Sequence, residues 1–118
     1  MKWLALVESG QYAVSWNQAA KAFQSRISKS EWVAGMKKLR ARFGKVASHD
    51  FQGITYPENP PSISSGKHVA LKYKVSFSKG IRADEVVSMV LKNNGEWRVS
   101  GYFIVPTNLV RLESLDHR

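Results

Sequence analysis

The stretch GEWRVSGYFI, residues 95 to 104, alternates as a strand does but carries bulky side chains on both of its faces. Residues 85 to 92 also have a strand pattern, so an antiparallel hairpin is predicted. A three-residue loop of Asn93, Asn94 and Gly95 pairs Lys92 with Glu96, Leu91 with Trp97, Met89 with Val99 and Val87 with Gly101. A two-residue Asn94-Gly95 loop would pair Leu91 with Arg98 and mix the two faces, so the three-residue loop is favoured.

This register gives the hairpin one wholly apolar face, which we expect helices to cover. The inner face consists of Val87, Met89, Leu91, Trp97, Val99, Gly101 and Phe103. The outer face is more apolar than a solvated surface needs, which indicates a homodimer contact through Lys72, Lys74, Val86, Val90, Arg98, Tyr102 and Ile104. The alternative is ordinary exposure, with cover from a short tail helix in NLVRLESL, residues 108 to 115.

Two further strands are expected before the hairpin. HVALKYKVSF, residues 68 to 77, has the clearest two-residue period in the chain and directs Val69, Leu71, Tyr73, Val75 and Phe77 to one face. Another strand is expected within residues 45 to 56. The Pro- and Ser-rich segment YPENPPSISSG, residues 56 to 66, is typical of a long surface loop.

The N-terminal part of the chain has helical periodicity. Trp3, Leu4, Leu6 and Val7 have helical spacing, and after Gly10 a second helix would bury Tyr12, Trp16, Ala19 and Phe23. Ser28 and Glu31 match the capping-box pattern and predict the start of a third helix. Its buried stripe would be Trp32, Met36, Leu39 and Phe43, with Gly44 at its C-terminal end.

These elements predict an α+β fold, with three N-terminal helices packed on a four-stranded antiparallel sheet. The 118 residues fit one domain, which we expect over residues 1–105, followed by a C-terminal tail at 106–118. No stretch approaches the ~20 apolar residues of a membrane-spanning helix. The absence of cysteine excludes disulfides and thiolate sites in this chain.

The sequence resembles a bacterial family known only as domain of unknown function four thousand and nineteen, within the nuclear-transport-factor-two superfamily. The resemblance covers roughly residues 3–105. It rests on WLALVESGQYAVSW at the start, Trp32, FG at 43–44, YP at 56–57, Phe77, Glu85, Val87, Met89 and GEWRVSGYFI. Glu8 stands where Asp is more usual. The resemblance implies a cystatin-like cone, in which the helices pack on the concave face of a strongly bent sheet, and it supplies no established activity or catalytic residue.

The resemblance also implies an exported protein, periplasmic or secreted after removal of a leader. The start MKWLALVESG does not match a signal peptide, because its apolar run is shorter than the ~7–15 residues of such a segment and no small-residue cleavage site follows. A cytoplasmic location therefore stays open.

The candidate acid–base residues are His49, Asp50, His68 and Asp84, and they form no recognisable constellation in the sequence. They lie near predicted strand ends, so no catalytic residue is predicted. Glu8 and Glu85 are expected to be surface residues that pair with Arg or Lys at the rim. His49, His68 and His117 lack paired ligand spacing, so neither a metal nor a cofactor is predicted.

The aromatic residues suggest a cavity for a small apolar ligand. The predicted lining is Trp16, Trp32, Tyr73, Met89, Trp97 and Phe103, although filling the core of a small domain is the more ordinary role of such rings. We therefore predict a non-enzymatic module that binds a small apolar molecule or a protein. One alternative is an isomerase or dehydratase that uses an inward Asp or His.

A second alternative is a polyanion-binding protein, since the net charge is +9. Its basic surface would include Lys37, Lys38, Arg40, Arg42 and Lys45 on one side, and Lys72, Lys74 and Arg98 on the other. No nucleic-acid-binding motif accompanies these residues, and a solvated basic surface is the favoured interpretation.

Overall fold

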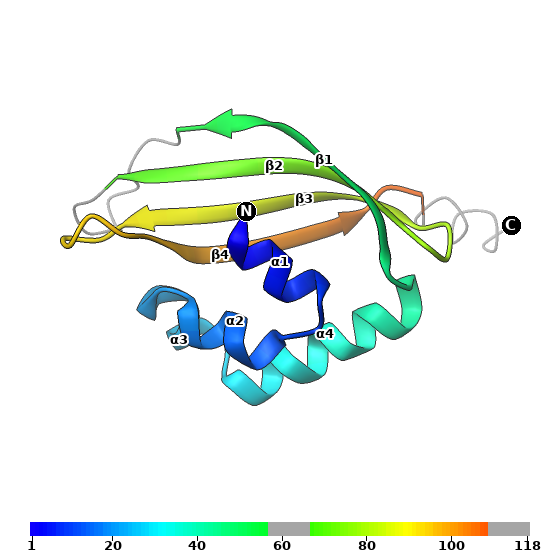
Figure 1. The fold of residues 1–118 in the computed structure, drawn as a ribbon, viewed down its shortest axis with the longest axis horizontal. Coiled ribbons are helices and arrows are strands. Elements are labelled where there is room, and N and C mark those ends of the chain that lie inside the picture. The colour runs from blue at the N-terminus through cyan, green and yellow to red at the C-terminus, as the bar shows by residue number, and fades with distance from the viewer. Residues whose placement is uncertain (57–66, 109–118) are drawn as a thin grey trace, which may run out of the picture.

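The computed structural model describes residues 1–56 and 67–108. Within these ranges the helices are α1 (Lys2–Glu8), α2 (Tyr12–Gln18), α3 (Lys21–Arg26) and α4 (Lys29–Phe43), and the strands are β1 (Val46–Thr55), β2 (His68–Phe77), β3 (Arg82–Leu91) and β4 (Trp97–Pro106). The strands form one antiparallel sheet in the order β1-β2-β3-β4, with the helices on one side of it (Figure 1). The predicted α+β class is confirmed. None of the helices in the described ranges is long and apolar enough to cross a membrane.

The start and end of α4 are as predicted from local sequence. The Ser28 hydroxyl accepts a hydrogen bond from the Glu31 amide at 3.1 Å, and the Glu31 carboxylate accepts one from the Ser28 amide at 3.0 Å. The helix ends at Gly44, whose φ of +87° favours glycine. A Cβ atom there would also clash with the Ser78 hydroxyl oxygen, so the close approach of the β2–β3 turn requires glycine as well.

The predicted second helix is divided in two. Ala19 and Ala20 have extended backbone angles between α2 and α3, and both are buried. The break lets the Ala20 amide donate to the Val99 carbonyl of β4 at 2.8 Å. At this point the backbone amide therefore bonds to edge strand β4 instead of continuing the helix.

The β3–β4 hairpin has the predicted three-residue loop. Gly95 has a φ of +84°, and the Lys92 amide donates to the Glu96 carbonyl at 2.8 Å. Leu91 pairs with Trp97 and Met89 with Val99, as expected.

The predicted pairing of Val87 with Gly101 is wrong, because β4 contains a bulge at Ser100. Gly101 lies opposite Ser88, and Val87 lies opposite Tyr102. Since one extra residue exchanges the two faces of a strand, every predicted position beyond the bulge is reversed.

The bulge corrects both predicted faces of β4. Tyr102 and Ile104 pack toward the core, while Phe103 and Val105 lie on the outer face, 56% and 60% exposed. Gly101 also turns to the outer side, where a Cβ atom would meet Phe103 and Ser88. Tyr102 and Ile104 therefore do not belong to the predicted dimer face, which keeps Lys72, Lys74, Val86, Val90 and Arg98. Homodimerisation through the outer face stays a prediction.

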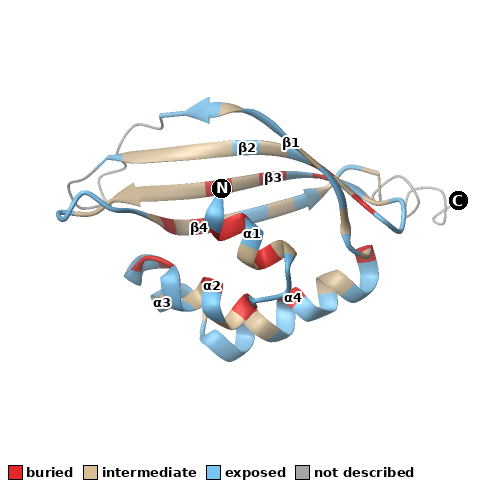
Figure 2. Cartoon of the chain, in the orientation of Figure 1, coloured by how far each residue is buried: buried red, intermediate tan, exposed pale blue. Residues whose placement is uncertain are grey.

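The core lies between the helices and the middle of the sheet, and Figure 2 shows buried residues on α1, α4, β3 and β4. Trp32 is its centre: its ring lies 5.9 Å from Trp3, 5.0 Å from Phe23 and 5.7 Å from Tyr102. The fully buried Ser15 accepts from the Trp32 indole N–H at 2.9 Å, and its carbonyl accepts from the Trp3 indole at 2.8 Å. The indole groups are therefore buried with their donors satisfied.

The helices do not cover the whole inner face, which corrects the prediction for Trp97. Alternation from the buried Val99 directs Trp97 to the inner face, yet Trp97 is 43% exposed. The hydrogen bond from the segment between α2 and α3 reaches β4 at Val99. The part of the sheet nearest the hairpin loop is therefore left partly open.

Candidate functional site

Two bulges in β1 turn His49 toward the helices. The register places Val46 opposite Phe77, His49 opposite Val75, Phe51 opposite Tyr73 and Ile54 opposite Leu71, with shifts between Val46 and Ser48 and between Phe51 and Gly53. The inward residues therefore do not follow simple alternation. This is why the sequence pattern predicted no inward direction for His49.

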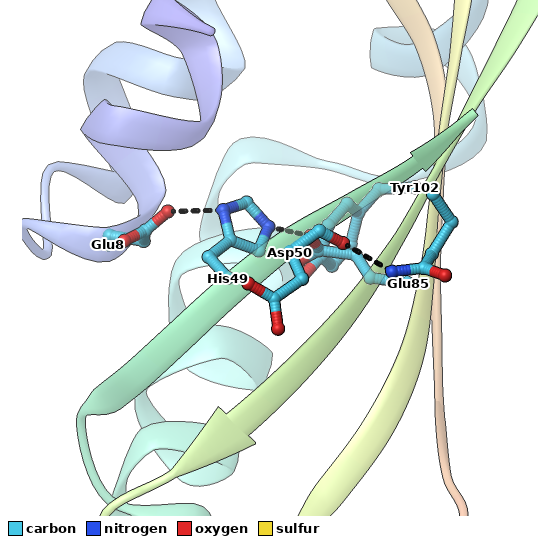
Figure 3. Close-up of polar contacts among 6 residues, drawn as sticks. Glu8, His49, Asp50, Glu85 and Tyr102 are labelled. Carbon is cyan, nitrogen blue, oxygen red and sulfur yellow. Dashed lines mark hydrogen bonds and ion pairs between the residues drawn. The ribbon is translucent and has the colours of Figure 1, made fainter. Parts of the chain in front are cut away.

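His49 bridges two carboxylates that belong to distant parts of the chain. Its Nδ1 atom lies 3.0 Å from Oε2 of Glu8 at the end of α1, and its Nε2 atom lies 2.5 Å from Oε1 of Glu85 on β3. Figure 3 shows the Glu8 side chain reaching from α1 to the imidazole on β1. The predicted pairing of these glutamates with Arg or Lys at the rim is therefore wrong.

Glu85 is the most buried member of this cluster, at 5% exposure. Its second oxygen, Oε2, accepts a hydrogen bond from the Tyr102 hydroxyl of β4. A carboxylate removed from water requires such partners, because an unpaired buried charge is strongly unfavourable. We call the four side chains Glu8, His49, Glu85 and Tyr102 the His49 cluster.

The geometry of the His49 cluster favours a protonated imidazole. A neutral histidine has one N–H group and can donate to only one acceptor, whereas both ring nitrogens here face carboxylate oxygens. The hydrogen bond to Glu85 raises the pKa of His49; burial opposes this, and the charges of Glu85 and Glu8 add to the rise. Burial, followed by the charge of Glu85, raises the pKa of Tyr102, which keeps its hydroxyl protonated as a donor.

A small cavity of about 20 Å³ lies beside the His49 cluster. Its lining combines the cluster with Arg40 and Tyr12 and with the apolar side chains of Val7, Met36, Leu39, Val46 and Phe77. The Arg40 guanidinium donates to the Tyr12 hydroxyl at 3.0 Å and to the Glu8 carbonyl at 2.9 Å. The volume suits about one water molecule, not an organic ligand.

The other acid–base candidates lie away from this cluster. Asp50 is exposed and pairs in register with Lys74 on the outer face. Asp84 lies on the same face, 3.5 Å from the Lys74 ammonium. His68 is half-buried and pairs with Val90. Within the described residues, no group of His, Asp and Glu side chains is arranged to hold a metal ion.

The six predicted pocket residues do not form one site. Trp32 is buried in the core, and Trp16, Tyr73 and Met89 pack against that core. Trp97 is partly exposed on the inner face, and Phe103 lies on the outer face because of the bulge. None of the six lines the cavity beside His49.

The inner face of the sheet also carries a second candidate surface. Phe51 and Ile54 of β1 and Trp97 of β4 are 55%, 46% and 43% exposed, although all point to the side that carries the helices. Half-buried Leu71 of β2 and Met89 of β3 lie between them in the sheet. We call Phe51, Ile54, Leu71, Met89 and Trp97 the open apolar face.

Residues 1–102 match the family described as Protein of unknown function (DUF4019). This match covers most of the chain and confirms the family resemblance found in the sequence motifs. No curated protein matches the chain. Membership of the wider nuclear-transport-factor-two superfamily stays a prediction.

Proposed function

Because the chain belongs to DUF4019, a family without an assigned function, we propose from its own geometry that it is a non-enzymatic module that binds a small apolar molecule. The ligand would lie on the open apolar face. The observation that carries this proposal is the exposure of Phe51, Ile54 and Trp97 on the inner side of the sheet. Several large apolar side chains exposed on one face of a sheet are typical of contact surfaces.

The dimensions of the open apolar face favour an elongated ligand. Its residues come from all four strands, which spans about 14 Å across the sheet at about 4.8 Å between neighbouring strands. Trp97 pairs with Leu91, four residues along β3 from Val87, which is in line with Ile54, and this offset adds about 13 Å along the strands. The cavity beside the His49 cluster is too small for such a molecule, so the open apolar face is the better candidate of the two. Tyr73, whose ring lies 5.4 Å from that of Phe51, would add an aromatic contact at one end.

Binding of the neutral apolar dye Nile red tests this proposal without contribution from the positive charge of the protein. We expect saturable binding with a blue shift of the dye, and at least a tenfold loss of affinity in the double variant Phe51→Ser/Ile54→Ser, since removing each apolar side chain from the binding surface costs about 1 kcal/mol or more. The matched control is Phe103→Ser, because Phe103 is as exposed as Phe51 but lies on the opposite face. Equal affinity in wild type and double variant would contradict the proposal.

An acid–base enzyme is the second candidate, because the structure brings the inward His49 together with two carboxylates and a tyrosine. A protonated histidine of this kind can act as a general acid, but the cavity beside it would have to open before an organic substrate could reach the ring. Asp50 and Asp84 have no part in this version, since both lie on the outer face. A turnover on carbonyl compounds that survives in His49→Gln would exclude it.

Export remains part of the proposal, supported only by the resemblance to exported members of the family. Recovery of the protein in the cytoplasm alone on cell fractionation would contradict export.

A further inference from the structure

We propose that His49 is a pH-operated latch, whose protonated imidazole ties Glu8 of α1 to Glu85 of β3 and holds the first helix on the sheet. The inference is independent of the proposed ligand. It begins with the position of Glu8, the last residue of α1. Trp3, Leu4 and Val7 of this helix pack in the core, the Trp3 indole donates to Ser15 of α2, and Arg40 of α4 donates to the Glu8 carbonyl. The Glu8 carboxylate contacts His49 of the sheet.

Charged and polar side chains from several elements face His49 or lie beside it. Glu8 of α1 and Glu85 of β3 face the two ring nitrogens, and Tyr102 of β4 donates to Glu85. Tyr73 of β2 stacks on the imidazole, with 4.4 Å between the ring centroids and 18° between the ring planes. Arg40 of α4 and Tyr12 of α2 line the same cavity, and the chain's N-terminal amino group acts weakly in the opposite direction.

Loss of the proton breaks one of the two bridges. Neutral His49 has a single N–H and can keep one carboxylate as acceptor, so the other carboxylate faces a lone pair. Glu85 is buried and also holds the Tyr102 hydroxyl, whereas the Glu8 side chain is 35% exposed and can turn to water. Deprotonation therefore releases Glu8, and with it the polar attachment of α1 to β1.

The direction of the pH effect follows from the raised pKa of His49. The Glu8 carboxylate contributes to this rise and leaves the ring when α1 opens, whereas Glu85 stays beside it, so the pKa of His49 is lower with α1 open than with α1 closed. The protonated ring therefore stabilises the closed state fully below the pKa of the open state, and this stabilisation is lost as the pH rises through the pKa of the closed state. Between these two pKa values a single proton makes the equilibrium constant for opening of α1 rise by at most about tenfold per pH unit. The helix is therefore held in mildly acidic solution and loosened in alkaline solution.

Hydrogen exchange of the α1 amides, followed by NMR and corrected for intrinsic rates, measures this opening. In the wild-type protein, the protection of α1 should fall by up to about tenfold per pH unit as His49 loses its proton above pH 6.5, while the protection of β3 amides changes less. In Glu8→Gln, the protection of α1 below pH 6.5 should already be reduced and its pH dependence weakened. The matched control His68→Gln replaces a half-buried histidine of the outer face and should behave as wild type.

Two results would contradict the proposal that protonated His49 holds α1 on the sheet. One is protection of α1 that does not change with pH across the titration of His49. The other is the same pH dependence in Glu8→Gln as in wild type, because the opening would then be due to another group. The Glu8 variant removes no buried side chain, so a folding failure is not expected to obscure the comparison.

Discussion

Replacing His49 with leucine is expected to destabilise the protein by about 3 kcal/mol below pH 6.5. The substitution leaves Glu85 buried with the Tyr102 hydroxyl as its one remaining partner in the cluster. An uncompensated buried carboxylate is more costly than the loss of an attractive interaction, because its desolvation is no longer offset. The estimate is at the lower end of the range for broken buried pairs, since the His49 side chain itself is 18% exposed. Urea unfolding of both proteins measures the difference.

A double-mutant cycle separates this explanation from simple loss of packing. Replacing both His49 and Glu85 with leucine should recover part of the loss, because no buried charge remains. His68→Leu is the control, with an expected effect below about 1 kcal/mol at a half-buried position of the outer face. A double variant as unstable as the sum of the two single variants would contradict the account.

Replacing Trp32 with alanine is expected to cost about 3–5 kcal/mol of unfolding free energy, the range for a large aromatic residue in a core. Trp32 packs against rings from α1, α3 and β4, so its removal leaves a cavity where these elements meet. The substitution also leaves the Ser15 hydroxyl oxygen without the indole donor it accepts from. A loss of this size is a large fraction of the roughly 5–15 kcal/mol by which folded domains are stable.

Trp97→Ala is the matched control for this core prediction. Trp97 lies on the same side of the sheet but is 43% exposed, so its truncation should cost less than half as much as that of Trp32. Thermal or urea unfolding of the two variants checks the order. Equal losses would mean that the inner face near the hairpin is closed and that no open apolar face exists there.

Features determined by short-range sequence were predicted correctly. The capping box at Ser28 and Glu31, the C-terminal Gly44 and the loop closed by Gly95 each depend on the conformation of a few neighbouring residues. The face of β2 was also predicted correctly, because its pattern alternates without a bulge and Val75 and Phe77 are buried.

Features determined by an irregular residue were not predicted. The bulge at Ser100 reverses the faces of Tyr102 and Phe103, and the two bulges of β1 turn His49 inward. A bulge has no strong sequence signature here, and a single extra residue is enough to reverse a face. The break at Ala19 and Ala20 escaped prediction for a related reason, since it depends on a hydrogen bond to a strand that comes much later in the chain.

One signal of the His49 cluster was present in the sequence. Counting back in steps of two from Val87, an inner position of β3, leads to Glu85, a charged residue in an apolar series that begins at Ala83. A carboxylate at such a position requires a partner inside the fold, and His49 and Tyr102 provide it. The identity of those partners depends on the bulges and could not be predicted from the sequence.

The bridge between Glu8 and Glu85 requires a doubly protonated imidazole, and the nitrogen NMR spectrum of His49 at neutral pH measures that protonation state. The spectrum is assigned by comparison with His49→Gln. We expect both Nδ1 and Nε2 to carry a proton, because Nδ1 faces the Glu8 carboxylate of α1 and Nε2 faces the Glu85 carboxylate of β3. A neutral ring with one bare nitrogen under these conditions would contradict the bridge between Glu8 and Glu85.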